Sequence, residues 1–294
     1  MSKTHLLDPS WLARLERMQV AVRKAAGGNQ AGKRRSRQLG SSMEFADYRP
    51  YVPGDDLRRL DWNAYARSGK LFLKKFWDET QLHVSLYIDC SRSMDFGQPR
   101  KLDLAVRLAA ALGYMSLCHL DRVSVYAFDR QILGSLRGMQ GKGNSLRLMQ
   151  FLAGLSPGGA GDLDQALRSP GALQGRAGIS IVLSDFLFDS GCERAIARLQ
   201  AARQEVTLVQ ILSQEELSPA YQGELRLIDS ETGLAKEVSV TEKLLQEYRN
   251  SVTSFRRQLA GFAYGRGVSC VFAQPELPLE TTLFSVLRQA GVIR

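Results

Sequence analysis

Three oxygen-bearing side chains, Asp89, Ser91 and Ser93, follow one another at alternate positions directly after an apolar run at residues 86–88. An apolar run that ends in polar residues is typical of a buried strand that delivers its last side chains to the edge of a sheet. Carboxylate and hydroxyl oxygens are hard ligands, which suit Mg²⁺, Mn²⁺ or Ca²⁺ better than zinc. The same groups can cap a helix or perform nucleophilic chemistry. The pattern therefore leaves three roles open.

Two further segments place oxygen ligands where strands are expected to end. A glycine-rich loop leads to Asp162, and an apolar strand over residues 178–186 carries Asp185 at its end. In a doubly wound sheet, ligands bind outside the carboxyl ends of the strands. The residues expected to meet in one such crevice are Asp89, Ser91, Ser93, Asp162 and Asp185. They hold a divalent ion, most simply Mg²⁺, or they keep this geometry around water, or they only cap and hydrogen-bond in a loop.

The segments that must position these residues alternate between apolar strands and amphipathic helices. Strands are expected over residues 83–89, 121–129, 131–137, 178–186, 205–213 and 268–274, with a hairpin at 224–240. Helices are expected over residues 1–28, 101–120, 143–155, 162–169, 192–204, 241–267 and 279–293. Such alternation favours an α/β fold with a doubly wound, mostly parallel sheet.

The chain is expected to fall into three parts. Residues 1–40 form an N-terminal helix and a basic linker, residues 41–80 an irregular, β-rich cap, and residues 81–294 the α/β domain. The cap contains turn signals at Pro53-Gly54 and Ser68-Gly69. Its aromatic residues are expected to pack within the cap, and they are Trp62, Tyr65, Phe72, Phe76 and Trp77.

Composition indicates a soluble cytoplasmic protein. Hydrophobic residues make up 44% of the 294 residues, but none of the apolar runs approaches the roughly 20 residues that span a bilayer. The amphipathic N-terminus lacks the apolar region of a signal peptide. The four cysteines lie far apart in the sequence, which favours reduced thiols over a zinc or redox site.

Basic residues exceed acidic ones, giving a net charge of +9, and part of the excess lies in GKRRSRQ at residues 32–38. Because no recognised nucleic-acid motif accompanies this stretch, nucleic-acid binding is not expected. A second basic group could contact phosphate or an acidic partner surface. It consists of Arg49, Arg58, Arg59 and Arg67. The alternative is internal pairing with the neighbouring acids Asp47, Asp55, Asp56 and Asp61.

The order Asp-x-Ser-x-Ser after one strand and an aspartate after a later strand resembles the metal-ion-dependent adhesion site of von Willebrand factor A domains. The matching positions are Asp89, Ser91 and Ser93 in the first motif and Asp185 in the third. The second motif normally supplies a threonine from a loop that reads roughly Gly-Gly-Thr-Asp-Leu, and here Gly161 stands at that position. The resemblance implies a von Willebrand factor A-like fold with a degenerate site, in which Asp162 or water replaces the threonine.

The segment EFADYRPYVPGDDLRRLDWNAYARSGKLFLKKFWDE is similar to the signature of the bacterial proteins catalogued as domain of unknown function 58 (DUF58). The matching residues are Arg49, Tyr51, Gly54, Asp55, Asp56, Arg59, Asp61 and Trp62. In that family the signature precedes a von Willebrand factor A-like domain, and the likeness runs here from about residue 40 to the end. It implies a non-enzymatic partner of a MoxR-type AAA+ ATPase, in chaperone-like or assembly work.

The sequence gives little support to an enzymatic function. A phosphatase with an aspartate nucleophile at Asp89 needs a second aspartate two residues on, where Ser91 stands, and a serine hydrolase needs a Gly-x-Ser-x-Gly elbow. We therefore expect a protein-interaction module whose strand-end crevice engages an acidic side chain of its partner. The alternatives are a scaffold with a vestigial metal site that binds through residues 43–80, and an uncharacterised hydrolase.

Overall fold

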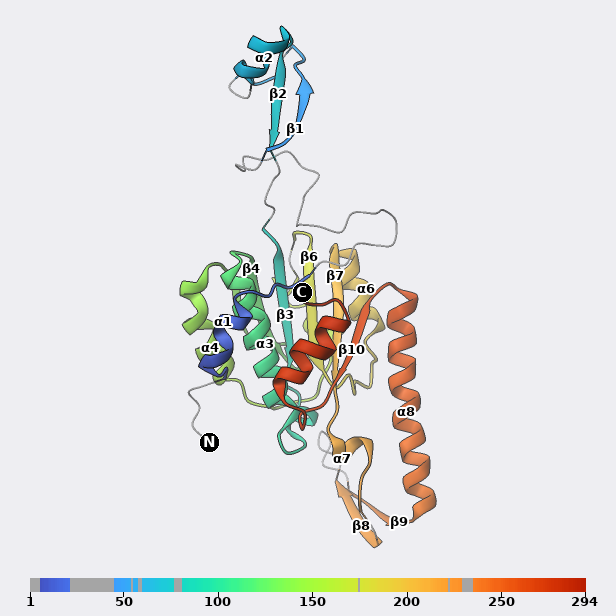
Figure 1. Cartoon of the computed structure of the whole chain (residues 1–294). Helices are drawn as coiled ribbons and strands as arrows, with labels where there is room; N and C mark the ends of the chain where they lie inside the picture. Colours follow the sequence, from blue (N-terminus) through green and yellow to red (C-terminus); the bar gives the residue numbers. More distant parts are fainter. Residues whose placement is uncertain are drawn as a thin grey trace. The chain divides into compact units, whose positions relative to one another are not determined.

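The computed structural model describes two compact units, one made of Met1–Ala25 with Leu82–Arg294 and the other of Ala26–Gln81 (Figure 1). The described residues are 6–21, 45–53, 55–57, 60–76, 81–173, 175–221, 223–228 and 235–294. The basic stretch 32–38, the N-terminal linker and the turn of the 224–240 hairpin lie outside them. Within the described residues, none of the helices is long and apolar enough to cross a membrane.

The large unit is built on a six-stranded sheet. Its strands are β3 (His83–Asp89), β4 (Arg122–Phe128), β5 (Ile132–Met139), β6 (Gly178–Ser184), β7 (Gln204–Ile211) and β10 (Ser269–Ala273). They lie in the order β10-β7-β6-β3-β4-β5, all parallel except β5, which pairs antiparallel with β4. Counted within the sheet, this is the doubly wound order 3-2-1-4-5-6, with the third strand reversed. The predicted α/β fold with a doubly wound, mostly parallel sheet is confirmed.

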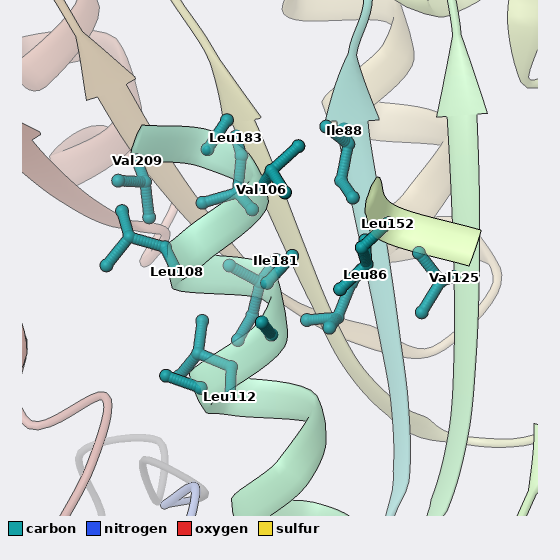
Figure 2. Close-up of a cluster of buried hydrophobic side chains, with 14 of the residues drawn as sticks. Leu86, Ile88, Val106, Leu108, Leu112, Val125, Leu152, Ile181, Leu183 and Val209 are labelled. Atoms are coloured by element: carbon teal, nitrogen blue, oxygen red, sulfur yellow. The ribbon is translucent and has the colours of Figure 1, made fainter. Parts of the chain in front are cut away.

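Helices cover both faces of this sheet because the buried strands are apolar on both sides. The helices are α3 (Lys101–Cys118), α4 (Ser145–Ala153), α5 (Leu163–Ala166), α6 (Glu193–Ala201) and α8 (Glu242–Gly265). Side chains alternate along a strand. Leu86 and Ile88 therefore join the cluster under α3 and α4 (Figure 2), while Tyr87 joins the cluster under α5, α6 and α8. The carboxyl ends of β3 and β6 lie side by side, since Ile88 pairs with Leu183.

The N-terminal segment packs on the large unit, but its helix is shorter than predicted. Helix α1 covers only Pro9–Leu15, where a helix through residue 28 was expected. Val20 instead forms an antiparallel bridge with Ile293 near the C-terminus. The predicted last helix at 279–293 ends earlier, at residue 289, and its middle, η4 (Thr281–Leu287), is π-helical. In both segments the helix-like spacing of apolar residues continues beyond the observed helix. The chain leaves the helix there because its N-terminal and C-terminal segments pair with each other.

In the part of the small unit that the structure describes, a two-stranded antiparallel sheet is accompanied by the helix α2. Strand β1 (Phe45–Pro50) pairs with β2 (Phe72–Phe76), and α2 (Trp62–Ser68) lies between them in sequence. Asp61 starts the helix, because its carboxylate accepts hydrogen bonds from the backbone N–H groups of Asn63 and Ala64.

The remaining elements follow β7. Helix α7 (Gln214–Leu217) comes first, and the strands β8 (Gly223–Ile228) and β9 (Ala235–Val240) then form a separate antiparallel pair before α8 begins. The predicted hairpin over residues 224–240 matches these two strands. Among the elements of this segment, α7 carries a residue of the site described next.

Candidate functional site

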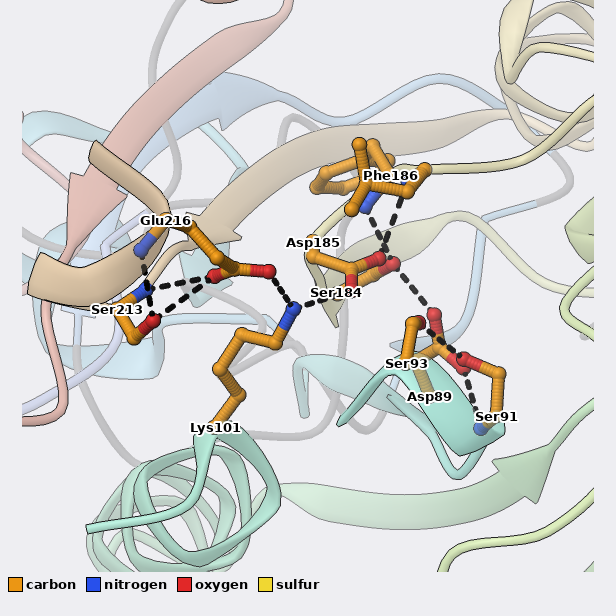
Figure 3. Close-up of polar contacts among 10 residues, drawn as sticks. Asp89, Ser91, Ser93, Lys101, Ser184, Asp185, Phe186, Ser213 and Glu216 are labelled. Carbon is orange, nitrogen blue, oxygen red and sulfur yellow. Dashed lines mark hydrogen bonds and ion pairs between the residues drawn. The ribbon is translucent and has the colours of Figure 1, made fainter. Parts of the chain in front are cut away.

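Asp89 ends β3 and is fully buried at the carboxyl edge of the sheet. One carboxylate oxygen, Oδ1, accepts a hydrogen bond from the backbone N–H of Ser91 at 2.8 Å. The other, Oδ2, accepts one from the hydroxyl of Ser184 at 2.6 Å (Figure 3). Both oxygens are therefore engaged by groups of the chain itself.

Ser184 ends the neighbouring strand β6, Asp185 follows it directly, and both are fully buried. The Ser184 hydroxyl accepts a hydrogen bond from the backbone N–H of Phe186 at 2.8 Å, and Asp185 Oδ1 accepts one from the N–H of Leu187 at 3.1 Å. Phe186 adopts a left-handed backbone with φ of 61°. This conformation costs a non-glycine residue about 1–2 kcal/mol, and it turns the backbone so that these two bonds form.

Lys101, which the sequence reasoning did not single out, supplies the cation of this site. It is the first residue of α3, its side chain is 0% exposed, and its ammonium nitrogen lies 2.7 Å from Asp185 Oδ2. The same nitrogen donates to Glu216 Oε1 of α7 at 2.5 Å. Figure 3 shows the ammonium between these two carboxylates. The partners are 84 and 115 residues away in sequence, so no local motif connected them.

Glu216 is held in place by its own helix. Its Oε2 accepts hydrogen bonds from the backbone N–H and the hydroxyl of Ser213, at 2.8 and 3.2 Å, while the Ser213 hydroxyl accepts from the N–H of Glu216. This is a reciprocal capping box at the start of α7. The sequence Ser-Gln-Glu-Glu is a local signal for the cap, but it does not indicate that the free oxygen of Glu216 meets Lys101.

The other predicted ligands lie nearer the surface. The Ser93 hydroxyl is 3.0 Å from the Ser91 hydroxyl. Asp162 caps the short helix α5, where its Oδ1 accepts from the N–H of Gln165 at 2.9 Å. Asp162 also lines a shallow cavity of about 350 Å³. The structure thus brings Asp89, Ser91 and Ser93 together beside Ser184, and it turns Asp162 toward a helix terminus.

Gly161 leaves no room for the threonine of the adhesion-site pattern. A Cβ atom at this position would lie 2.7 Å from the ring of Phe188 and 3.2 Å from Cβ of Ser91. Phe188 packs against Phe128 and Phe186 in the buried cluster of that face. The aromatic ring therefore takes the space in which a threonine side chain would have to lie.

Burial dominates the electrostatics of Asp89. Burial, joined by the nearby charge of Asp185, raises the pKa of this carboxyl from 3.8 to about 7. Hydrogen bonds from Ser184 and Ser91 oppose the shift.

These contacts do not fit a divalent ion. An ion needs several oxygen ligands free to turn toward it, yet both oxygens of Asp89 are engaged and Asp185 already faces an ammonium group. Among the described residues, no group of three or more histidine, cysteine, aspartate or glutamate side chains is placed to hold a metal. The site is instead a closed network of hydrogen bonds and ion pairs that joins the ends of β3 and β6 to α3 and α7.

The basic residues of the small unit have different surroundings. Arg49 forms an ion pair with Asp55, as the pairing alternative expects. Arg67 is exposed and lines a cavity of about 310 Å³. Arg58 and Arg59 lie outside the described residues.

The helix of the small unit presents aromatic side chains that the sequence reasoning had assigned to packing. Trp62 is 63% exposed and Tyr65 is 45% exposed. Their rings meet edge to face, with centroids 6.3 Å apart and an interplanar angle of 90°. Asp61 ties the start of this helix to β1, because it caps α2 and also accepts a 2.7 Å hydrogen bond from the hydroxyl of Tyr48.

Comparison with known proteins places the chain in a family. The chain is 27% identical over 265 residues to uncharacterized protein Mb1516 of Mycobacterium bovis and to uncharacterized protein Rv1480 of Mycobacterium tuberculosis, which covers 88% of this chain and 83% of each relative. The crystal structure of BatB from Bacteroides thetaiotaomicron is 15% identical and covers 71% of this chain and 96% of its own, with a TM-score of 0.39.

A second solved structure, an aerotolerance-related membrane protein from Bacteroides fragilis, is 14% identical, covers 71% of this chain and 98% of its own, and has a TM-score of 0.42. We draw nothing about function from likeness at this level. The family model described as protein of unknown function DUF58 matches residues 47–258. These residues include the signature of the small unit and most of the sheet, and the chain belongs to the DUF58 family.

Proposed function

We propose that this protein is a non-enzymatic protein-interaction module that acts with a MoxR-type AAA+ ATPase, and that it binds this partner through the exposed face of α2. The partner is the one that the family resemblance implies. The observation that carries the choice of surface is the exposure of Trp62 and Tyr65, an edge-to-face aromatic pair on a helix whose start is capped by Asp61.

Such a pair has the properties of an interface hot spot. Tryptophan and tyrosine dominate measured binding energies at protein interfaces, while a neighbouring charge mainly steers association. Arg67 is also exposed on this helix, but it comes two residues after Tyr65 and five after Trp62 and therefore lies on a different side of the helix. Large exposed aromatic side chains are costly to leave in water, and their grouping on one short helix supports a binding role.

The strand-end residues support this choice of surface and argue against a reaction there. Asp89, Ser184 and Asp185 are fully buried, and Ser91 is nearly so. A partner carboxylate or a substrate cannot reach these atoms without opening the network. Ser93 and Asp162, which are half-buried, are the candidate ligands of this edge that a partner can touch directly.

The test is a binding measurement between the full-length chain and the MoxR-type ATPase of the same organism. Substituting both Trp62→Ala and Tyr65→Ala is expected to weaken binding at least 30-fold, since one hot-spot side chain contributes about 2 kcal/mol or more. The double substitution Ser91→Ala and Ser93→Ala is expected to leave the affinity unchanged. Tyr264→Ala is the matched control, because Tyr264 is an exposed aromatic residue on α8 of the other unit.

Each remaining outcome has a definite meaning. Loss of binding in the serine variant together with normal binding in the aromatic variant would place the interface at the strand-end crevice. Absence of binding by the wild-type chain, in the presence of nucleotide as well as without it, would refute the ATPase as partner.

A further inference from the structure

Lys101 stands where a lysine is unfavourable for three separate reasons. Its side chain is completely buried, and lysine is almost never fully buried unless it is paired. It lies in the first turn of an 18-residue helix, where the positive end of the helix dipole repels a cation. Fixing this long side chain also costs conformational entropy. Something in its surroundings must offset these costs.

The offset comes from two carboxylates that converge on the ammonium from different parts of the chain. Asp185 lies at the end of β6 and Glu216 on α7, at 2.7 and 2.5 Å from the nitrogen. Each carboxylate uses its second oxygen to accept backbone N–H groups, from Leu187 and from Ser213. The positions of both carboxylates are therefore fixed independently of the lysine. Asp185 and Glu216 together form a preorganised site for one cation, called the seat below.

That seat adjoins the position at which a von Willebrand factor A-like site holds its metal ion. Asp185 is the residue that matches the third adhesion-site motif, and the oxygen it would turn toward an ion faces the ammonium group instead. On the other side of Asp185, the carboxylate of Asp89 is bonded to Ser91 and Ser184 (Figure 3). Phe188 fills the space of the threonine beside Gly161.

We propose that the ammonium of Lys101 is a built-in cation that replaces the divalent ion of this strand-end site, so that the site is complete without metal. The ammonium ties together the loop after β3, the loop after β6 and the short helix after β7. This role of Lys101 in holding the edge together does not depend on which surface binds the partner.

The experiment compares the full-length chain with its Lys101→Ala variant in chelator and in millimolar Mg²⁺ or Mn²⁺. For the wild type we expect no change in the midpoint of thermal unfolding and no Mn²⁺ bound in an electron paramagnetic resonance titration. The substitution removes the ammonium group, so that the carboxylates of Asp185 and Glu216 face the space that it occupied. Mn²⁺ should then bind and raise its midpoint by several degrees, because a ligand specific to the native state stabilises it. Ethylammonium, which replaces the lost side-chain end, should raise the midpoint as well.

Lys243→Ala is the matched control, since Lys243 lies in the first turn of α8 with a side chain that is 87% exposed. It should behave as the wild type in every solution. If Lys101→Ala fails to fold in chelator, refolding is repeated with Mn²⁺ or ethylammonium, and recovery of soluble protein is the readout. The proposal is overturned by Mn²⁺ binding to the wild type that Asp89→Asn abolishes, or by a Lys101→Ala protein that responds to neither cation in melting or refolding.

Discussion

Replacing Lys101 by methionine is the sharpest perturbation of the buried network. Methionine keeps an unbranched chain of similar length, so most of the packing of the lysine methylenes is retained. What disappears is the ammonium group, which leaves the buried Asp185 without its ion-pair partner and leaves Glu216, with a side chain 15% exposed, bonded only to its own cap. The substitution therefore removes the positive charge of Lys101 while changing the volume of its side chain only slightly.

The expected loss follows from the burial of the pair. Removing one partner of a buried ion pair typically costs 3–5 kcal/mol, because an uncompensated charge stays in the interior. For a unit of this size each kcal/mol lowers the unfolding midpoint by about 2–4 °C. The Lys101→Met protein should thus melt about 6–20 °C below the wild type.

Thermal and urea unfolding followed by circular dichroism measure this loss. Asp185→Asn placed in the Lys101→Met background removes the unpaired charge and should recover part of the stability, so the two substitutions are expected to be strongly non-additive. Lys243→Met, at an exposed lysine, should change stability by less than about 0.5 kcal/mol. A loss below about 1 kcal/mol for Lys101→Met, or strict additivity with Asp185→Asn, would show that the ammonium does not hold this edge together.

Three further predictions concern residues of the sheet and of the loops at its carboxyl edge. Burial and the charge of Asp185 raise the pKa of Asp89 from 3.8 to about 7, so the folded chain retains a proton that the unfolded chain releases, and the contribution of this group to stability falls as pH rises from about 4 to about 7. The free energy of unfolding, measured across that pH range, should therefore decline less steeply in Asp89→Asn than in the wild type. Equal slopes in the two proteins would refute the pKa shift. Gly161→Thr restores the adhesion-site residue, but the new side chain would clash with Phe188. Denaturant unfolding should show that the free energy of unfolding falls by about 1–3 kcal/mol, and by less when Phe188→Ala is also present. A stabilised Gly161→Thr variant would contradict the clash. Tyr87→Phe deletes the buried 2.7 Å hydrogen bond to the carbonyl of Ala172 and should cost about 1–3 kcal/mol in the same assay, whereas Tyr264→Phe at an exposed tyrosine should cost nothing measurable.

Much of the fold was accessible from local pattern. Apolar strands such as residues 83–89 bury both faces, and the amphipathic helices between them have no other place to put their apolar stripes. Strand ends could be located because Asp89 and Asp185 each follow an apolar run. Parallel pairing of β3 with β6 then brings these two acids to one edge, as the sequence reasoning expected.

Helix ends and exposure were less accessible. The periodicity of residues 1–28 gave no sign that the chain would leave the helix at Leu15 and pair near Val20 with Ile293, since that pairing joins the two ends of the chain. In the cap, Trp62 and Tyr65 were assigned to packing on residue type alone. Their exposure became evident only from the folded cap, in which Asp61 starts the helix and none of its residues is buried.

The amino-acid sequence by itself determined the family signature, the doubly wound sheet and the acids and hydroxyls at its carboxyl edge, because each depends on residue type and short-range periodicity. Only the tertiary structure decided what those acids do. Lys101 meets Asp185 and Glu216 across 84 and 115 residues of chain, and Phe188 fills the space beside Gly161. Contacts over such separations are selected by the packing of whole elements, so local pattern carries no trace of the cation that completes this site.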